Sequence, residues 1–394
     1  MIIKQEFPHY IKYMGSKTKL LDFIIEAIND VFNGGGVCDL FAGSCSLSGA
    51  IRDQTTMYSN DIQQYSLVIA DAYLNFWKNC DLPSSCTLLK RANDIVSINR
   101  STTSDCIPYN KIKSLDDFNA TERFAQQLIN KKFDNNYHLF TKYYSGTWWS
   151  TEQCLWIDAI KQVSDEHEGQ PYHSHIVACL LHAMAYCSQG TGHFAQYRDA
   201  TTIYSMRDIL VYRTRKIQDY FSNKYDSAIT LTPDYGPINE HVITSLDYKE
   251  RLRTLPQCTI YADPPYCFVH YSRFYHALET LVRYDYPKIQ KRGSDVVKGR
   301  YREDRHQSPF CIRSKVEKAF HDLFTGAAET NSNLILSYSD TGMISLNQLA
   351  TIMKIAMPNY DFSDKTINHK HMTMGRQGDR TRNVREKLLI AKKQ

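Results

Sequence analysis

The 394-residue sequence lacks the features that define several classes of protein. Its eleven cysteines are scattered, with no Cys-x-x-Cys pair and no Cys/His ligand spacing, so we expect neither a metal site nor a disulfide framework. Residues 1–10 have no positively charged segment followed by an apolar one, and no apolar run reaches membrane-spanning length. We therefore expect a reduced, cytoplasmic protein with no membrane partner.

A strong charge of one sign is also missing. Lysine and arginine number 47 against 42 acidic residues, a net charge of +5, which is compatible with a nucleic-acid partner but does not indicate one. Hydrophobic residues make up 42% and charged residues 23%, which is typical of a folded protein rather than a disordered one. The length is sufficient for two or three domains, or for one domain with a large insertion.

What the sequence does contain is a distinctive stretch at the end of an apolar run, Asp263-Pro264-Pro265-Tyr266. Two adjacent prolines neither continue a helix nor donate to a strand ladder, so we expect a strand to end here in a rigid, extended turn. The carboxylate and a proline carbonyl are suited to accept hydrogen bonds from an amino group on a flat ring, and the tyrosine is suited to stack on the face of that ring. A stiff loop explains an isolated tetrapeptide equally well, because proline pairs often mark turns.

Two earlier segments predict the start of a Rossmann-like sheet. Residues 37–41 resemble a buried strand and residues 42–46 a tight turn into a helix, although Gly43 is the only expected glycine and Cys45 occupies the second position. A second short strand ends at Asp61, about 20 residues after this loop, where a carboxylate commonly binds ribose hydroxyls. A solvated residue at the end of a strand is the alternative for Asp61.

Residues 73–240 have a different, mostly helical pattern. Thr151 is expected to cap a helix that runs to Val163, and residues 176–185 form a second, apolar helix. The basic segment 207–216 fits a solvated face and a DNA contact equally well. We interpret the block as an insertion that carries substrate recognition.

The strand pattern resumes near residue 241, with short apolar runs at Val242-Ile243, 259–262 and 334–340. Residues 283–318 are basic with interleaved tyrosines, which is typical of a loop that tracks phosphates, and a solvated surface loop is the alternative. Near the end of the chain, residues 375–380 predict a turn between two short strands.

Taken in order, these elements resemble the Dam-like, alpha-order group of N6-adenine DNA methyltransferases. The matching motifs are Lys12-Tyr13-Met14-Gly15-Ser16-Lys17, residues 39–46, Asn60-Asp61, Asp247-Tyr248, Asp263-Pro264-Pro265-Tyr266 and a late hairpin at 375–385. The resemblance covers residues 8–75 and 241–394 and departs from the family at Cys45, where a glycine is expected.

The resemblance implies a Rossmann-like methyltransferase core, formed by residues 1–72 and 241–394, with a helical target-recognition insertion at 73–240. It implies S-adenosylmethionine as the cofactor and a flipped-out adenine of duplex DNA as the substrate. Catalysis would fall to Asp263, Pro264, Pro265 and Tyr266. The cofactor would be bound by Tyr13, Gly15, Lys17, Asp39, Phe41, Gly43, Ser44, Asp61, Ile62, Asp247 and Tyr248. Tyr271, Tyr275, Arg300, Arg302 and Arg305 are candidates for DNA contact.

Other functions remain open at this point. The same fold acts on the exocyclic amine of cytosine in enzymes that more often carry serine at the position of Asp263. An RNA or protein methyltransferase and a catalytically silent DNA-binding protein are further alternatives, although an intact Asp263 argues against the last. We expect a monomer of bacterial or phage origin, with a cognate restriction endonuclease as a candidate partner.

Overall fold

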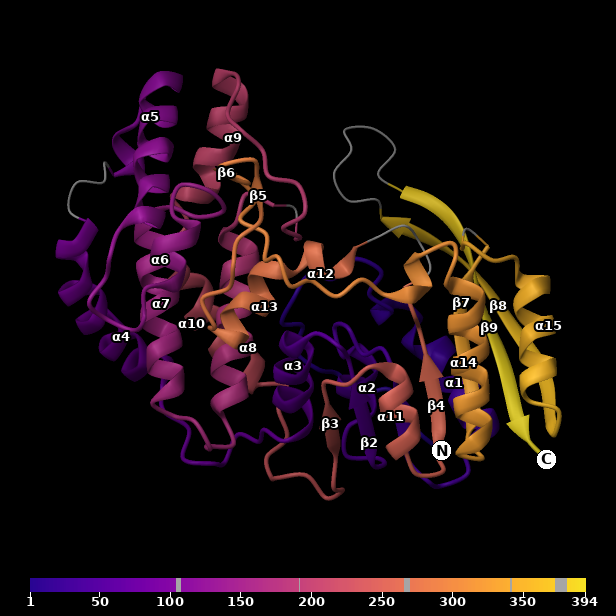
Figure 1. The fold of residues 1–394 in the computed structure, drawn as a ribbon. Helices are drawn as coiled ribbons and strands as arrows, with labels where there is room; N and C mark the ends of the chain where they lie inside the picture. Colours follow the sequence, from indigo (N-terminus) through magenta and orange to yellow (C-terminus); the bar gives the residue numbers. More distant parts are fainter. Residues whose placement is uncertain (104–107, 191, 266–269, 341, 373–380) are drawn as a thin grey trace.

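A seven-stranded sheet forms the centre of the molecule (Figure 1). The computed structural model describes residues 1–103, 108–190, 192–265, 270–340, 342–372 and 381–394. The strand order is β3-β2-β1-β4-β7-β9-β8, and all neighbouring pairs are parallel except β7–β9 and β8–β9. The strands are β1 (Val37–Asp39), β2 (Met57–Asn60), β3 (Val242–Thr244), β4 (Thr259–Ala262), β7 (Asn333–Ser339), β8 (Tyr360–Met372) and β9 (Thr381–Lys393). The α/β class predicted from the sequence is confirmed.

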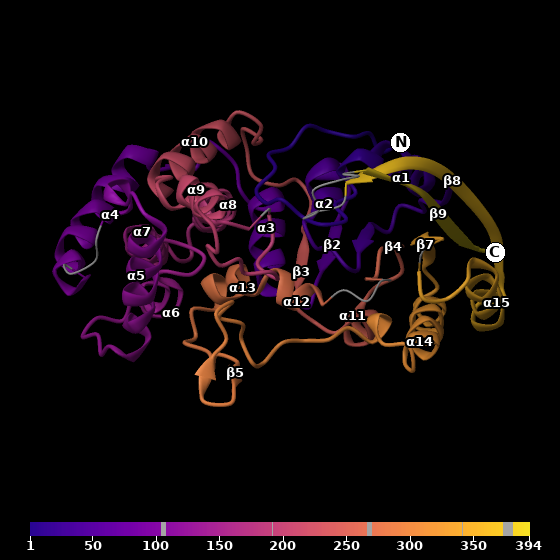
Figure 2. The same cartoon turned by 90° about the horizontal axis from the view of Figure 1, so that it is seen from above.

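The sheet is buried on both faces, as the apolar strand sequences require. In β7, Leu334 and Leu336 pack on one side, while Ile335 between them packs on the other. Figure 2 shows helices on the two sides of the sheet. One face is covered by α1 (Leu21–Val31), α2 (Ser46–Ile51) and α3 (Gln64–Leu74), and the other by α11 (Tyr248–Thr254), α14 (Val316–Glu329) and α15 (Leu346–Ala356). These helices cover the two faces of the sheet and leave the ends of its strands uncovered.

Residues 85–229 contribute helices and 3-10 turns. The helices are α4 (Ser85–Asn99), α5 (Leu115–Gln126), α6 (Leu139–Tyr144), α7 (Thr151–Asp165), α8 (His173–Cys187), α9 (Ile203–Arg213) and α10 (Ile217–Ile229). One hydrophobic cluster extends from α1 through α3 into α7 and α8, so the helical block shares its core with the sheet. The boundaries at residues 72 and 240 therefore do not separate two hydrophobic cores. The division of the chain into a catalytic core and a recognition insertion is a proposal about function.

Two local predictions need correction. The helix near Thr151 is capped by Ser150, whose side chain accepts from the backbone N–H of Gln153 in a capping box. The strands of the late hairpin are long, at 13 residues each, because β9 pairs along β7 as well as β8. The predicted turn at 375–380 lies outside the described residues. Within the described part of the chain, no helix is long and apolar enough to span a bilayer, and no group of side chains is arranged to bind a metal.

The basic segment 207–216 does not form one exposed face. Arg213 is buried and its Nε and Nη2 donate to the carboxylate of Glu122 at 2.9 Å each. Its guanidinium also donates to the carbonyl oxygen of Trp148 at 2.9 Å. This ion pair fastens α9 to α5, so Arg213 is structural rather than a phosphate contact.

We expect Arg213→Met to lower the free energy of unfolding by about 3 kcal/mol, because Glu122 would be left buried without its cation. Arg207→Met makes the same change at an exposed position of the same helix and should cost less than about 0.5 kcal/mol. Urea unfolding of both variants measures the difference. Equal midpoints would show that the buried pair adds nothing to stability.

Candidate active site

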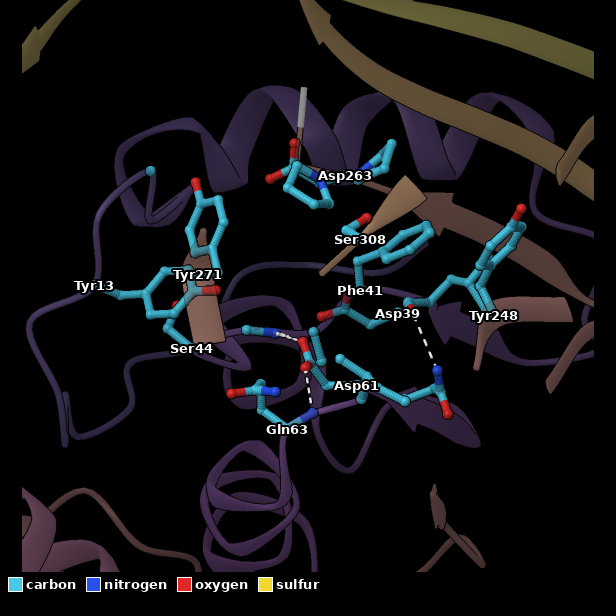
Figure 3. Close-up of a pocket in the computed structure, with 18 of the residues that line it drawn as sticks. Tyr13, Asp39, Phe41, Ser44, Asp61, Gln63, Tyr248, Asp263, Tyr271 and Ser308 are labelled. Atoms are coloured by element: carbon cyan, nitrogen blue, oxygen red, sulfur yellow. Dashed lines mark hydrogen bonds between the residues drawn. The ribbon is translucent and has the colours of Figure 1, made fainter. Parts of the chain in front are cut away.

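One pocket opens at the carboxyl ends of β1, β2 and β4 (Figure 3). Parallel strands end at the same edge of a sheet, which is where ligands bind in open α/β folds. The register aligns Asp39 of β1 with Ser59 of β2 and Tyr261 of β4, and the chain beyond these positions turns into the pocket wall. All eleven residues predicted to bind a cofactor line this pocket: Tyr13, Gly15, Lys17, Asp39, Phe41, Gly43, Ser44, Asp61, Ile62, Asp247 and Tyr248. Asp263, Pro264 and Pro265 line it too, whereas Tyr266 lies outside the described residues.

Asp61 organises the floor of the pocket. Its Oδ2 accepts from the backbone N–H of Gly43 at 2.9 Å, and its Oδ1 accepts from that of Gln63 at 2.8 Å (Figure 3). Burial raises the pKa of Asp61 to about 6, although these backbone hydrogen bonds oppose the rise. One carboxylate thus fixes the turn after β1 and the start of α3, and it retains acceptor capacity for a ligand.

An aromatic wall faces this floor. The ring of Tyr248 lies 5.9 Å from that of Phe41 and 5.1 Å from that of Phe310, and Phe41 and Phe310 meet edge to face at 5.5 Å. Asp247 caps α11 by accepting from the backbone N–H of Lys249 at 3.0 Å. Apolar rings beside a cap carboxylate suit a flat heterocycle with an exocyclic amine.

The pocket is acidic. Burial raises the pKa of Asp39 well above its usual range, and the nearby carboxylates of Asp263 and Asp61 add to the rise. Burial raises the pKa of Asp263 to about 7, with Lys17 opposing the rise and Glu386 adding to it. A cationic ligand in the cavity would favour the ionised forms of these three carboxyl groups.

Lys17 lies between two carboxyl groups, in addition to lining the pocket where it was predicted to bind the cofactor. Its Nζ is 3.3 Å from Oδ1 of Asp263 and 2.6 Å from Oε1 of Glu386 on β9. Its contact with the motif after β4 follows from the fold and was not predicted. A role for Lys17 at the cofactor stays a prediction.

Two predicted DNA-contacting tyrosines form a stack with Tyr13. Ring centroids of Tyr13 and Tyr275 lie 4.8 Å apart, and those of Tyr13 and Tyr271 lie 5.8 Å apart. Tyr275 is fully buried and its hydroxyl accepts from the backbone N–H of Met14 at 2.7 Å. Tyr271 lines the pocket, so it is the better placed of the two to meet a base.

Cys45 occupies a backbone conformation that favours glycine, with φ of 54°. Its thiol is buried against Ser66, with Sγ 3.1 Å from the carbonyl oxygen of that residue. Cys45 is not among the residues that line the pocket, so the side chain leaves the approach to the loop backbone open. Close approach of a ligand to the loop backbone depends instead on Gly43, which has a φ of 52°. A Cβ added at this position would come within 2.9 Å of the Tyr13 ring.

The predicted phosphate contacts fall into two groups. Arg302 is 1% exposed, and its guanidinium donates to both carboxylate oxygens of Asp285 at 2.7 Å and to Asp304 at 3.0 Å. Arg300 is also buried. Arg305 is partly exposed beside the Tyr301 ring and remains a candidate. Burial makes Arg300 and Arg302 supports of the segment, whereas exposed cations of the segment include Lys291 and Arg292 on the hairpin of β5 (Lys291–Arg292) and β6 (Asp295–Val296).

Three residues in or next to the pocket were not predicted from the sequence. Phe310, which packs against Phe41 and Tyr248, follows Ser308-Pro309, a turn whose sequence does not indicate an aromatic wall. Gln63 acts through its backbone N–H, which every non-proline residue has. Glu386 lies 123 positions after Asp263 by numbering, and the two acids share Lys17 because β9 inserts beside β7.

Comparison with known proteins agrees with this geometry. Residues 13–95 match the model of the D12 class N6 adenine-specific DNA methyltransferases. The chain is 24% identical over 356 residues to the modification methylase LlaI of Lactococcus lactis subsp. lactis, which covers 87% of this chain and 48% of that protein. It is 22% identical over 359 residues to the type II methyltransferase M.FokI of Planomicrobium okeanokoites, covering 87% of this chain and 47% of that protein.

The chain thus spans about half the length of these two curated relatives. A third relative is similar in size: the type II methyltransferase M.NlaIII of Neisseria lactamica is 20% identical over 387 residues, which cover 92% of this chain and 95% of that protein. The matched segment 13–95 includes the turn after β1, Asp61 and α3. The resemblance seen in the motifs is confirmed: residues 13–95 match the model of the D12 class N6 adenine-specific DNA methyltransferases, and the curated relatives are named modification methylases or type II methyltransferases.

Proposed function

We propose that the protein transfers a methyl group from S-adenosylmethionine to the N6 amine of an adenine in duplex DNA. The observation that carries the proposal is the position of Asp263-Pro264-Pro265 at the end of β4, in the same pocket as Asp61 and the Phe41–Tyr248 wall. A methyl donor and an acceptor amine must meet within reacting distance, so their sites must adjoin. The D12 class match and the names of the relatives support the same chemistry.

The pocket fits the cofactor by its chemistry. S-adenosylmethionine supplies a methyl group on a positively charged sulfur, and a cation in this cavity would favour the ionised forms of Asp39, Asp61 and Asp263, which line it. Asp61 would accept from the ribose hydroxyls, and Phe41 and Tyr248 would enclose the adenine ring. Gly43 leaves room between the loop and Tyr13 that a side chain would fill.

The residues of the chain would activate a poor nucleophile. The lone pair of an aromatic amine is delocalised into its ring, which lowers its reactivity. Asp263 and the carbonyl oxygen of Pro264 would accept hydrogen bonds from the two N–H groups of the amine, favour a tetrahedral nitrogen and stabilise the positive charge that develops there. This mechanism needs positioning and fixed charge, with no covalent intermediate on the protein. Tyr266 would stack on the flipped base.

A duplex would lie across the side of the molecule on which the pocket opens. In Figure 1 the β5–β6 hairpin and one end of the β8–β9 hairpin both lie above α12 (Tyr271–Phe274), which borders the pocket. Lys291 and Arg292 on β5 are exposed, as is Lys298 beyond β6, where its Nζ pairs with Asp199 at 2.7 Å. We assign phosphate contact to this hairpin and target recognition to the helical block 73–240.

Neutralising the hairpin tests the assignment. Lys291→Gln with Arg292→Gln should weaken binding to DNA of any sequence and lower the slope of log K against log salt by up to about 2, since each phosphate contact adds about 0.9. Lys318→Gln with Lys354→Gln removes the same charge from α14 and α15 and serves as the control. Equal salt slopes for the two double variants would rule out the hairpin as a phosphate contact.

The wider setting follows from the relatives, which are named modification methylases. We propose that this protein likewise protects DNA beside a cognate restriction endonuclease and that it acts as a monomer in the cytoplasm.

Incubation with labelled S-adenosylmethionine and plasmid DNA from a methylation-free host tests the activity. Label is expected in the duplex, with little in total RNA. Label in RNA alone would contradict the proposed substrate.

A further inference from the structure

Glu386 is a buried acid that no motif marks. It lies on β9, where its backbone pairs with Ser339 of β7 and Ile367 of β8, and it is 1% exposed. Its Oε1 is 2.6 Å from Nζ of Lys17 and accepts from the hydroxyl of Ser337 at 2.6 Å. Burying a carboxylate is costly unless it is paired, so its place beside the proposed catalytic motif needs a reason.

Lys17 links Glu386 to Asp263. The ammonium is closer to Glu386, at 2.6 Å, than to Asp263, at 3.3 Å. Oδ1 of Asp263 is buried and makes no hydrogen bond within the described part of the structure. Within this trio one positive charge faces two negative ones, and the ammonium lies nearer the acid that does not face the proposed substrate.

We propose that Glu386 is a positioning residue that draws the Lys17 ammonium away from Asp263, so that Asp263 keeps its acceptor strength for the amine of the target base. The inference rests on the proposed function and assigns it a residue outside its motifs. If Lys17 bound Asp263 alone, the ammonium and the base amine would compete for one carboxylate. The positive charge developing on the amine would then be less stabilised.

The groups around Asp263 set the expected pH dependence. They are Lys17 and Glu386, Tyr261 on the same strand, and the carboxyl group of Asp39. Burial raises the pKa of Asp263 to about 7, Lys17 lowers it and Glu386 raises it. Since the ionised form is the stronger acceptor, methyl transfer by the wild type should fall as pH drops through about 7.

Glu386→Gln removes a negative charge near Asp263 and leaves Asp263 as the one carboxylate of this trio that can pair with Lys17. Both changes lower the pKa of Asp263, so the acid limb of kcat should move to lower pH. At alkaline pH, single-turnover transfer to plasmid DNA should be about tenfold slower, because Lys17 then occupies the acceptor. The KM for S-adenosylmethionine should stay within about twofold, since Glu386 is not among the residues that line the pocket.

The matched control is Asp364→Asn on β8, which removes the same charge from an exposed pair with Lys387 on the same hairpin. Glu386→Asp keeps the charge and should retain the wild-type acid limb. In a Lys17→Met background, Glu386→Gln should change the transfer rate less than about twofold. An equal loss with and without Lys17, or an unshifted limb in Glu386→Gln, would overturn the proposal.

A second readout needs no activity. The Asp263 carboxyl is titrated by ¹³C NMR in protein labelled at aspartate and is assigned with Asp263→Asn. Its midpoint should fall from the wild type to Glu386→Gln and stay unchanged in Asp364→Asn. An unchanged midpoint in Glu386→Gln refutes the role of Glu386, whereas wild type that makes no methyladenine refutes the proposed function instead.

Discussion

Asp263→Ala is expected to slow methyl transfer by about a thousandfold or more, because the variant loses the carboxylate that stabilises charge on the amine. The affinity for S-adenosylmethionine should change by less than about threefold, since Asp61 and the aromatic wall remain. Single-turnover transfer and equilibrium cofactor binding measure the two effects separately. The matched control is Asp340→Ala, which removes an exposed carboxylate just after the neighbouring strand β7.

Loss of folding would not explain that result. Burial raises the pKa of Asp263 to about 7, above its usual value of 3.8. An acid whose folded pKa is raised supports the fold most below its unfolded pKa and loses that contribution as pH rises through the folded pKa. Above pH 7 the alanine variant should therefore unfold at no lower temperature than the wild type. Transfer retained within tenfold would exclude Asp263 as the acceptor.

Asp61→Ala should raise the Kd for S-adenosylmethionine by about 100-fold. The change removes two charge-assisted hydrogen bonds, at about 1.5–3 kcal/mol each, from the backbone of Gly43 and Gln63, together with the proposed acceptor for the ribose. Calorimetric titration measures the loss. Asp61→Asn keeps one acceptor oxygen and should fall between the alanine variant and the wild type.

Transfer at saturating cofactor should recover most of its rate in Asp61→Ala, in contrast to Asp263→Ala. That pattern separates a residue that binds the cofactor from one that acts on the reacting amine. A Kd unchanged in Asp61→Ala would move the ribose site elsewhere in the pocket.

The sequence was most informative where chemistry and strand ends coincide. Asp39 is the last residue of β1, Asp61 and Asp263 directly follow β2 and β4, and parallel pairing of these strands brings the three acids to one edge. That convergence is a property of parallel sheets, so short motifs far apart in the chain predicted one pocket.

Side-chain burial was harder to predict. Arg302 and Arg213 lie in basic segments that resemble solvated or phosphate-binding surface, yet each is buried against acids: Arg213 against Glu122, 91 positions away, and Arg302 against Asp285 and Asp304 of its own segment. A charge run gives the number of cations and leaves their partners undetermined, because pairing depends on tertiary contacts. Glu386 was missed for the same reason: its partner Lys17 is 369 positions away.

The base that receives the methyl group tests the central claim most directly. DNA from a methylation-free host, incubated with the protein and S-adenosylmethionine, is digested to nucleosides and analysed by mass spectrometry. The account predicts N6-methyladenine, and none with Asp263→Ala. N4-methylcytosine in place of methyladenine would contradict it.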